Sequence, residues 1–347
     1  MKKTVSVFIG AVLLISLSLQ LFSCTSKKQY KRTEIGVFDT HTVILGYEES
    51  EELFETRADE IIEKLRYYHR LFDIYYEYDG INNLKTVNDK GADGPVKVEK
   101  PVIDLLSYSK EIYGLTAGKT NIAMGSVLSI WHSYREKGID DPASAQLPPM
   151  EELERAARHV DIEGIFIDEE NGTVELLDEK MSLDVGAVAK GYSVEMTARY
   201  CEEKGYTGYA LSVGGNVRCI GAKPDGKKWE IGVQNPDTGS SDPYVSKVYL
   251  TNEALVTSGV YQRYYTVAEQ DYHHIIDPKT LMPSGRYASV SVISRDSGLA
   301  DALSTALFNM TEEEGKTIAE NAEAEVLWVY PDGTLKMTDG FSEYTKE

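Results

Sequence analysis

The sequence predicts an α+β fold in which helices and antiparallel strand pairs are mixed. Its 347 residues, 42% hydrophobic and 27% charged, have the composition of a globular protein with its own core. Helical periodicity dominates the first half, whereas the second half is rich in short strands separated by Gly and Asp turns. Helices and strands do not alternate regularly, which argues against a doubly wound parallel sheet.

The N-terminus has the pattern of an export signal. Lys2 and Lys3 precede an apolar stretch, and an L-x-x-C ending places Cys24 where the bacterial lipobox has its acylated cysteine. A retained membrane helix is the alternative, but Ser16 and Ser18 interrupt the run, which is short of the ~20 residues a span needs. We therefore predict a lipoprotein signal peptide over residues 1–23 and lipidation of Cys24.

A short polar segment is expected between the lipid and the folded part. Residues 24–33 contain several basic side chains and would form a tether beside an anionic membrane surface. The predicted location is the outer face of the bacterial cytoplasmic membrane, with residues 34–342 forming one domain.

The elements of this domain are predicted in chain order from composition and periodicity. Residues 35–45 have strand composition, and residues 51–76 carry apolar side chains at helical spacing. Further helices are expected at 102–113, 126–137, 150–159, 187–203, 299–310 and 312–322. Strands are expected at 213–222, 228–234, 254–257, 262–268, 272–276 and 288–293. Strand pairs should surround the turns at 170–172, 224–226 and 331–333, and residues 235–246 should form a surface loop between strands.

Charge and cysteine content exclude some functions. The formal net charge of the full chain is −20, from 36 basic and 56 acidic residues. Removal of residues 1–23 takes away Lys2 and Lys3, so the net charge becomes −22. Such a surface repels nucleic-acid phosphates.

Cys201 and Cys219 could pair outside the cytoplasm, or could be two small buried hydrophobic residues, and sequence spacing does not decide between these.

Two segments offer groups for a phosphate and a metal. Asp184 and Lys190 flank small residues at a strand-to-helix junction, where helix amides can meet an anion, although an ordinary junction would have the same pattern. Asp301 and Thr305 are four residues apart, so their oxygens share a helix face and suit Mg²⁺. The alternative is that Asp301 only stabilises the helix dipole near the N-terminus and that Thr305 bonds back to a helix carbonyl.

Two further segments contain residue types suited to proton transfer and phosphate binding. His273 and His274 are adjacent in a predicted strand and face opposite sides, so at most one serves a given site, and their spacing is wrong for zinc. Gly118-Lys119-Thr120 is similar to the end of a phosphate loop. The full pattern needs Gly at position 113, which is Tyr113, so a P-loop is rejected.

Five ordered motifs together resemble the ApbE family of FAD:protein FMN transferases, over residues 35–341. They are LDVGAVAKGY at 183–192, VGGN at 213–216, TSG at 257–259, HIIDP at 274–278 and ADALSTA at 300–306. The chain departs from the common family pattern at residues 38–40, where many members have M-G-T, and at Asn121, where many have Asp.

The resemblance implies a T-fold-like domain that binds FAD as substrate together with Mg²⁺. It implies Mg²⁺ ligands at Asp301, Thr305 and the Ala187 carbonyl, and His274 as the catalytic base. The implied FAD contacts are Phe38, Tyr75, Lys119, Thr120, Asn121, Asp184, Lys190 and Ile275.

The implied reaction is attack by a Thr or Ser hydroxyl of an exported acceptor flavoprotein on the FMN-side phosphorus of FAD, with release of AMP. By resemblance, a subunit of a respiratory redox complex is a candidate acceptor. Two alternatives stay open: hydrolysis of FAD to FMN and AMP by the same site, and flavin binding without catalysis.

Overall fold

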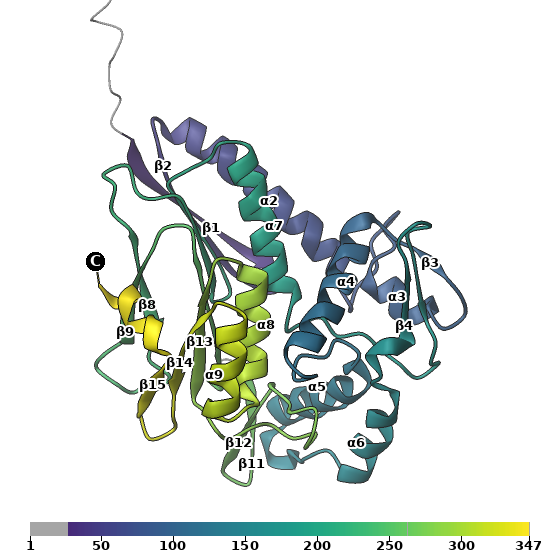
Figure 1. The fold of residues 1–347 in the computed structure, drawn as a ribbon. Coiled ribbons are helices and arrows are strands. Elements are labelled where there is room, and N and C mark those ends of the chain that lie inside the picture. The colour runs from purple at the N-terminus through teal and green to yellow at the C-terminus, as the bar shows by residue number, and fades with distance from the viewer. Residues whose placement is uncertain (1–26, 262, 347) are drawn as a thin grey trace, which may run out of the picture.

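A computed structural model describes residues 27–261 and 263–346, and its centre is one antiparallel sheet of eight strands (Figure 1). The predicted signal peptide and Cys24 lie outside the described residues. The strand order is β1 (Lys28–Val37), β2 (Thr40–Glu48), β6 (Tyr209–Val213), β7 (Asn216–Ile220), β10 (Ala254–Gly259), β13 (Ser289–Ser294), β14 (Glu325–Val329) and β15 (Leu335–Met337). Among the described residues, no helix is both long enough and apolar enough to cross a membrane.

Four helices pack on one face of this sheet: α2 (Glu51–Phe72), α7 (Ala189–Glu203), α8 (Ser297–Phe308) and α9 (Glu312–Asn321). Their ends follow local sequence signals. Ser50 caps α2 by accepting from the Leu53 amide, and Thr311 and Glu314 form a capping box at the start of α9. The apolar faces of these helices bury two clusters of side chains against the strands.

The other face of the sheet is covered by the hairpin of β8 (Trp229–Gln234) and β9 (Tyr244–Leu250), and by a 3₁₀ segment at Asp339–Thr345. Residues 235–243 connect the two strands of the hairpin, so the predicted surface loop is confirmed except at its end, where residues 244–246 already belong to β9.

A second group of elements lies on the opposite side of α7 and α8 from the sheet (Figure 1). It contains α3 (Leu84–Lys90), α4 (Lys100–Leu115), α5 (Gly125–Asp140), α6 (Met150–Ala156) and the small sheet of β3 (Val96–Lys97), β5 (Thr173–Leu176) and β4 (Ile165–Asp168). Its core is continuous with α7 and α8 through Tyr192 and Ala302. Two-stranded β11 (Tyr264–Val267) and β12 (Gln270–His273) pack beside α5.

The predicted α+β class is confirmed, but several local predictions were wrong. The helix predicted at 51–76 ends at Phe72, and the strand predicted at 213–222 is interrupted by the turn between β6 and β7. Residues 35–45 were expected as one strand, whereas the chain turns at Phe38-Asp39 between β1 and β2. β1 also begins earlier than expected, at Lys28, inside the segment assigned to the tether. The turn at 224–226 does not join a strand pair, because β7 pairs with β6 and β10 while β8 pairs with β9.

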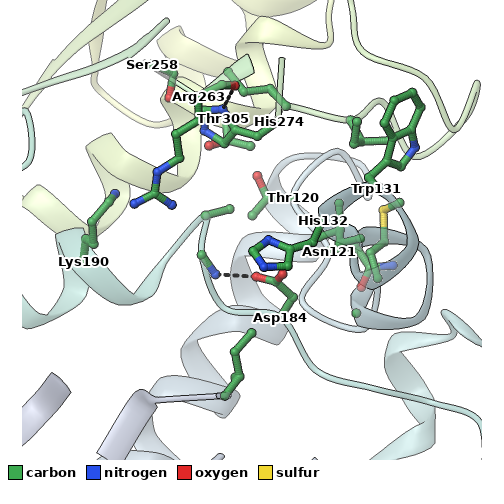
Figure 2. Close-up of a pocket in the computed structure, with 18 of the residues that line it drawn as sticks. Thr120, Asn121, Trp131, His132, Asp184, Lys190, Ser258, Arg263, His274 and Thr305 are labelled. Carbon is green, nitrogen blue, oxygen red and sulfur yellow. Dashed lines mark hydrogen bonds between the residues drawn. The ribbon is translucent and has the colours of Figure 1, made fainter. Parts of the chain in front are cut away.

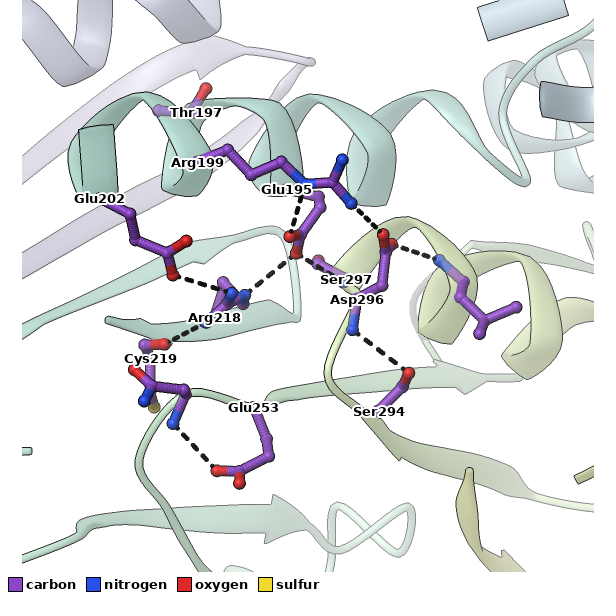
Figure 3. A network of polar contacts seen from close by, with 12 residues as sticks. Glu195, Thr197, Arg199, Glu202, Arg218, Cys219, Glu253, Ser294, Asp296 and Ser297 are labelled. Carbon is purple, nitrogen blue, oxygen red and sulfur yellow. Dashed lines mark hydrogen bonds and ion pairs between the residues drawn. The ribbon is translucent and has the colours of Figure 1, made fainter. Parts of the chain in front are cut away.

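Buried charges join α7, β7 and the start of α8 (Figure 3). The Glu195 carboxylate of α7 lies 3.0 Å from the Arg218 Nε of β7 and accepts a 3.0 Å hydrogen bond from the Ser297 amide. Arg218 also reaches Glu202 at 3.1 Å. Since Ser297 is the first residue of α8, this ion pair fixes where α8 begins relative to α7.

Candidate functional site

One cavity of about 680 Å³ collects nearly all the predicted site residues. Its walls come from α5, the junction before α7, the ends of β7 and β10, the segment after β12, and α8 (Figure 2). The predicted residues that line it are Tyr75, Lys119, Thr120, Asn121, Asp184, Ala187, Lys190, His274, Ile275, Asp301 and Thr305. Of the predicted catalytic, FAD and metal residues, all of which the structure describes, only Phe38 does not line it.

Asp301 is held where α7 and α8 touch. Its carboxylate is 3% exposed, accepts a 2.8 Å hydrogen bond from the Gly191 amide, and has both oxygens 3.4 Å from the Lys190 Nζ. The contact depends on glycine, because a Cβ on Gly191 would lie 2.3 Å from the Asp301 Cβ. The small residues at this junction therefore allow two helices to approach and a charged pair to form at the cavity wall.

Lys190 occupies the first turn of α7, where the helix dipole disfavours a cation. Its ammonium is compensated by Asp301 and lines the cavity. A cation thus faces the cavity, which suits a phosphate group.

Thr305 lies one turn beyond Asp301 on α8, and both line the cavity, as the four-residue spacing predicts. Within the described part of the chain the Thr305 hydroxyl makes no side-chain hydrogen bond, and no group of three or more His, Cys, Asp or Glu side chains is arranged to hold a metal. A carboxylate, a hydroxyl and a backbone carbonyl from Ala187 fit Mg²⁺, which binds few protein oxygens and completes its shell with water and substrate phosphates.

The two adjacent histidines have different surroundings. His273 is buried, bonds the Ser284 carbonyl through Nε2 at 2.7 Å and accepts from the Ile275 amide at Nδ1, so both its nitrogens are used by the fold. His274 lines the cavity, with Nδ1 3.2 Å from the Arg263 carbonyl. A carbonyl only accepts, so Nδ1 carries the proton and Nε2 keeps its lone pair. Burial, reinforced by the charge of Arg263, lowers the pKa of His274 to about 3.

Three residues expected to contact the substrate also bind the protein itself. The Lys119 Nζ lies 2.9 Å from the Asp277 carboxylate, and the Thr120 hydroxyl donates to the Ala302 carbonyl at 2.9 Å. Asn121 donates to the Val160 carbonyl at 2.9 Å, a bond that an aspartate in its place could not make. These contacts fix the cavity wall beside α8.

Phe38 lies in the tight turn between β1 and β2, where both Phe38 and Asp39 have φ of +52°. Its amide donates to His69 Nδ1 at 3.2 Å, and its ring meets the His69 ring edge-on. The next two residues, Asp39 and Thr40, line the cavity instead.

Three cavity residues beside Tyr75 were not predicted from the sequence: His132, Arg135 and Arg263. Tyr75 is 52% exposed and its ring lies 5.6 Å from that of His132 on α5. Arg135 and Arg263 line the cavity nearby, and burial together with the charge of Arg263 lowers the pKa of Arg135. The three-residue spacing of His132 and Arg135 on a predicted helix was the available signal, whereas the proximity of Arg263 depends on the tertiary fold.

Burial raises the pKa of the Asp184 carboxyl, which accepts from the Gly186 amide at 2.8 Å and faces these cations. Away from the cavity, Cys201 and Cys219 are buried and unpaired.

Comparison with known proteins gives a consistent result. The model of the ApbE family matches residues 34–328. The chain is 28% identical to an FAD:protein FMN transferase of Vibrio cholerae over 84% of its length and 81% of the relative's. It is 27% identical to one from Treponema pallidum, covering 74% of this chain and 73% of that one. The crystal structure of the ApbE protein from Thermotoga maritima superposes with a TM-score of 0.81 at 27% identity, covering 92% of this chain and all of that one.

Proposed function

The chain belongs to the ApbE family, and from that premise we propose that this transferase is an Mg²⁺-dependent FAD:protein FMN transferase. The observation that carries the proposal is the convergence of Asp301, Thr305, Lys190 and His274 on one cavity from three separate parts of the chain. The cavity offers oxygen ligands, a cation and a proton acceptor together.

In the proposed reaction, the hydroxyl oxygen of an acceptor Thr or Ser attacks the FMN-side phosphorus of FAD. The new O–P bond forms as the bond to the bridging pyrophosphate oxygen breaks, and AMP leaves. His274 Nε2 takes the hydroxyl proton, because Nδ1 is already committed to the Arg263 carbonyl. The low pKa of His274 keeps it unprotonated in the free enzyme near neutral pH.

The charge that spreads over the phosphate oxygens is met by fixed groups of this chain. Lys190 would bind the pyrophosphate. Asp301, Thr305 and the Ala187 carbonyl would hold Mg²⁺, which supplies positive charge opposite the phosphate oxygens when bound. Asp301 would then be shared between the metal and Lys190, which already lies 3.4 Å from it.

The flavin is expected at the aromatic side of the cavity. The half-exposed Tyr75 ring presents a flat apolar surface next to His132, suited to stacking on an isoalloxazine ring. Arg135 and Arg263 would face its electron-rich edge or the nearby phosphate.

The acceptor is proposed to be an exported flavoprotein, such as a subunit of a respiratory redox complex. The chain itself would be exported and held by a lipid on Cys24 at the outer face of the cytoplasmic membrane. Growth with labelled palmitate, comparing the wild-type chain with Cys24→Ser, tests this location.

Mass spectrometry of an acceptor protein tests the activity. Residues 27–347 are incubated with FAD and an acceptor carrying an S/T-G-A-T-like target, with Mg²⁺ or with a chelator. We expect the acceptor to gain the mass of FMN only with Mg²⁺. Free FMN and AMP at equal rates with and without acceptor would indicate hydrolysis instead, and intact FAD after long incubation would indicate binding alone.

A further inference from the structure

Resting on the proposed function, we propose that the Asn216 side-chain amide is a catalytic hydrogen-bond donor to the phosphate that is transferred. Asn216 lines the cavity, is 1% exposed, and its Nδ2 has no hydrogen-bond partner. Eight buried side-chain atoms of the described residues lack a partner, and of the residues that carry them only Asn216 lines the cavity.

The sheet register places this amide on the α8 side. Asn216 begins β7 and stands opposite Val256 of β10, so the two side chains share a face. Ser258, two residues further along β10, shares that face as well, and its hydroxyl lies 2.7 Å from the hydroxyl of Ser304 on α8. Asn216 is therefore directed toward the helix that carries Asp301 and Thr305.

The turn that precedes Asn216 keeps it at this position. Gly214 and Gly215 have φ of +54° and +93°, and a Cβ on Gly214 would lie 2.7 Å from the Thr40 hydroxyl. The β6–β7 turn therefore packs directly on the cavity wall formed by Thr40, and Asn216 follows it as the first paired residue of the strand.

A buried amide without a partner reduces stability, so its retention needs a reason. A phosphate oxygen in the cavity would supply the missing acceptor. The donor makes and breaks no covalent bond. It stabilises negative charge on a non-bridging oxygen while the acceptor O–P bond forms and the pyrophosphate bond breaks, and it is already oriented by the sheet.

The variant Asn216→Leu keeps the side-chain shape and removes the donor. We expect kcat for FMN transfer to fall about 100-fold, as when one oxyanion-hole donor is removed. The Kd for FAD, measured by flavin fluorescence, should stay within about threefold, because the bond is strongest in the transition state. The midpoint of thermal unfolding should be unchanged or higher, since an unpaired buried polar group is gone.

Thr42→Val is the matched control. Thr42 is equally buried in the same sheet, its hydroxyl also lacks a partner, and it does not line the cavity. Its kcat should equal that of the wild type. If Asn216→Leu does not fold, Asn216→Ala provides the same loss of donor without adding a charge.

Two results overturn the inference. One is a kcat within threefold of the wild type. The other is a loss of activity accompanied by a lower unfolding midpoint and an equal loss of FAD affinity, which marks a structural role. Absence of transfer by the wild-type chain is a different outcome, because it overturns the proposed function and this inference with it.

Discussion

The Asp301 carboxylate and the Lys190 ammonium meet at 3.4 Å across the contact between α8 and α7. Asp301 is almost fully buried, whereas Lys190 extends along the cavity wall. The pair therefore places an acidic and a basic side chain together at the cavity wall, where we propose that Mg²⁺ and a phosphate bind.

Asp301→Asn removes the negative charge of this side chain and keeps its size and shape. The amide oxygen can still accept from Gly191, but the ligand charge for Mg²⁺ is lost. We expect Mg²⁺ added with FAD to raise the stability of the wild type, by about 2.7 kcal/mol at one hundred times its Kd, and to leave Asp301→Asn unaffected. Thermal unfolding with and without Mg²⁺ measures both.

Asp89→Asn, which changes a surface carboxylate of α3, is the control for a general charge effect. An equal Mg²⁺-dependent shift in Asp301→Asn and in the wild type would contradict the assignment of Asp301 as a ligand.

Gly191→Ala should push α7 and α8 apart. The new Cβ would lie 2.3 Å from the Asp301 Cβ and 2.4 Å from the Ser297 carbonyl, both in closely packed surroundings. We expect a loss of about 1–3 kcal/mol in the free energy of unfolding, typical of overpacking. Gly114→Ala in α4, with no atom within 4 Å of the added Cβ, should instead be neutral or stabilising in the same denaturant titration.

The motifs of the site could be predicted because they are local. Asp301 and Thr305 share a face through helix geometry alone, and Asp184 with Lys190 flank a junction whose small residues are visible in the sequence. That His274 and not His273 faces the cavity is set by the Ser284 carbonyl, which lies eleven residues away along the chain.

The parts that the sequence could not show depend on distant contacts. Arg263 lies beside His274 because β11 and β12 form a hairpin, and His132 approaches Tyr75 across the fold. The Phe38-Asp39 turn was missed because Phe38 is not a usual choice for positive φ and no Gly or Asn accompanies Asp39. The strand-like composition of residues 35–45 continues through this turn, so composition alone predicted a single strand.

His274→Asn should remove the proposed base and keep the hydrogen bond from residue 274 to the Arg263 carbonyl. The Asn amide can still donate to the Arg263 carbonyl in place of Nδ1, so folding should be retained while kcat falls by about 10²–10⁴-fold. Wild-type kcat/KM should show no acid limb near pH 6.5, since His274 in the free enzyme stays neutral down to about pH 3. A limb near 6.5 that vanishes in His274→Asn would argue against the buried, neutral histidine.

The low pKa of His274 also makes the free energy of unfolding depend on pH. An unfolded histidine binds its proton near pH 6.5, while folded His274 does so only near pH 3. The unfolded state therefore binds more protons between these values, and the free energy of unfolding should fall as the pH is lowered through this window. The fall should be smaller in His274→Asn, measured by denaturant titration at several pH values.

Cys201 and Cys219 should be unreactive in the folded protein. Both are fully buried and unpaired, and burial raises the pKa of each thiol to about 12. A chain of residues 27–347, which lacks Cys24, should gain no mass with iodoacetamide under native conditions and two additions after unfolding in guanidinium chloride. Modification of the native chain would contradict this burial.

The buried pair of Glu195 and Arg218 offers the largest expected loss of stability. Both side chains are about 5% exposed, so Glu195→Ala leaves the Arg218 charge buried and removes the acceptor of the Ser297 amide (Figure 3). We expect the free energy of unfolding to fall by about 3–5 kcal/mol, measured by denaturant titration. Glu202→Ala removes the more exposed partner of Arg218 and should cost much less.

A double variant distinguishes the uncompensated charge from lost packing. Glu195→Leu combined with Arg218→Met removes both charges and keeps much of the side-chain volume, so it should recover most of the stability lost in Glu195→Leu alone. Because the pair also fixes the start of α8, four residues before Asp301, the double variant should still bind Mg²⁺ and FAD less well. Full recovery of stability together with wild-type Mg²⁺ affinity would show that the ion pair has no part in positioning Asp301.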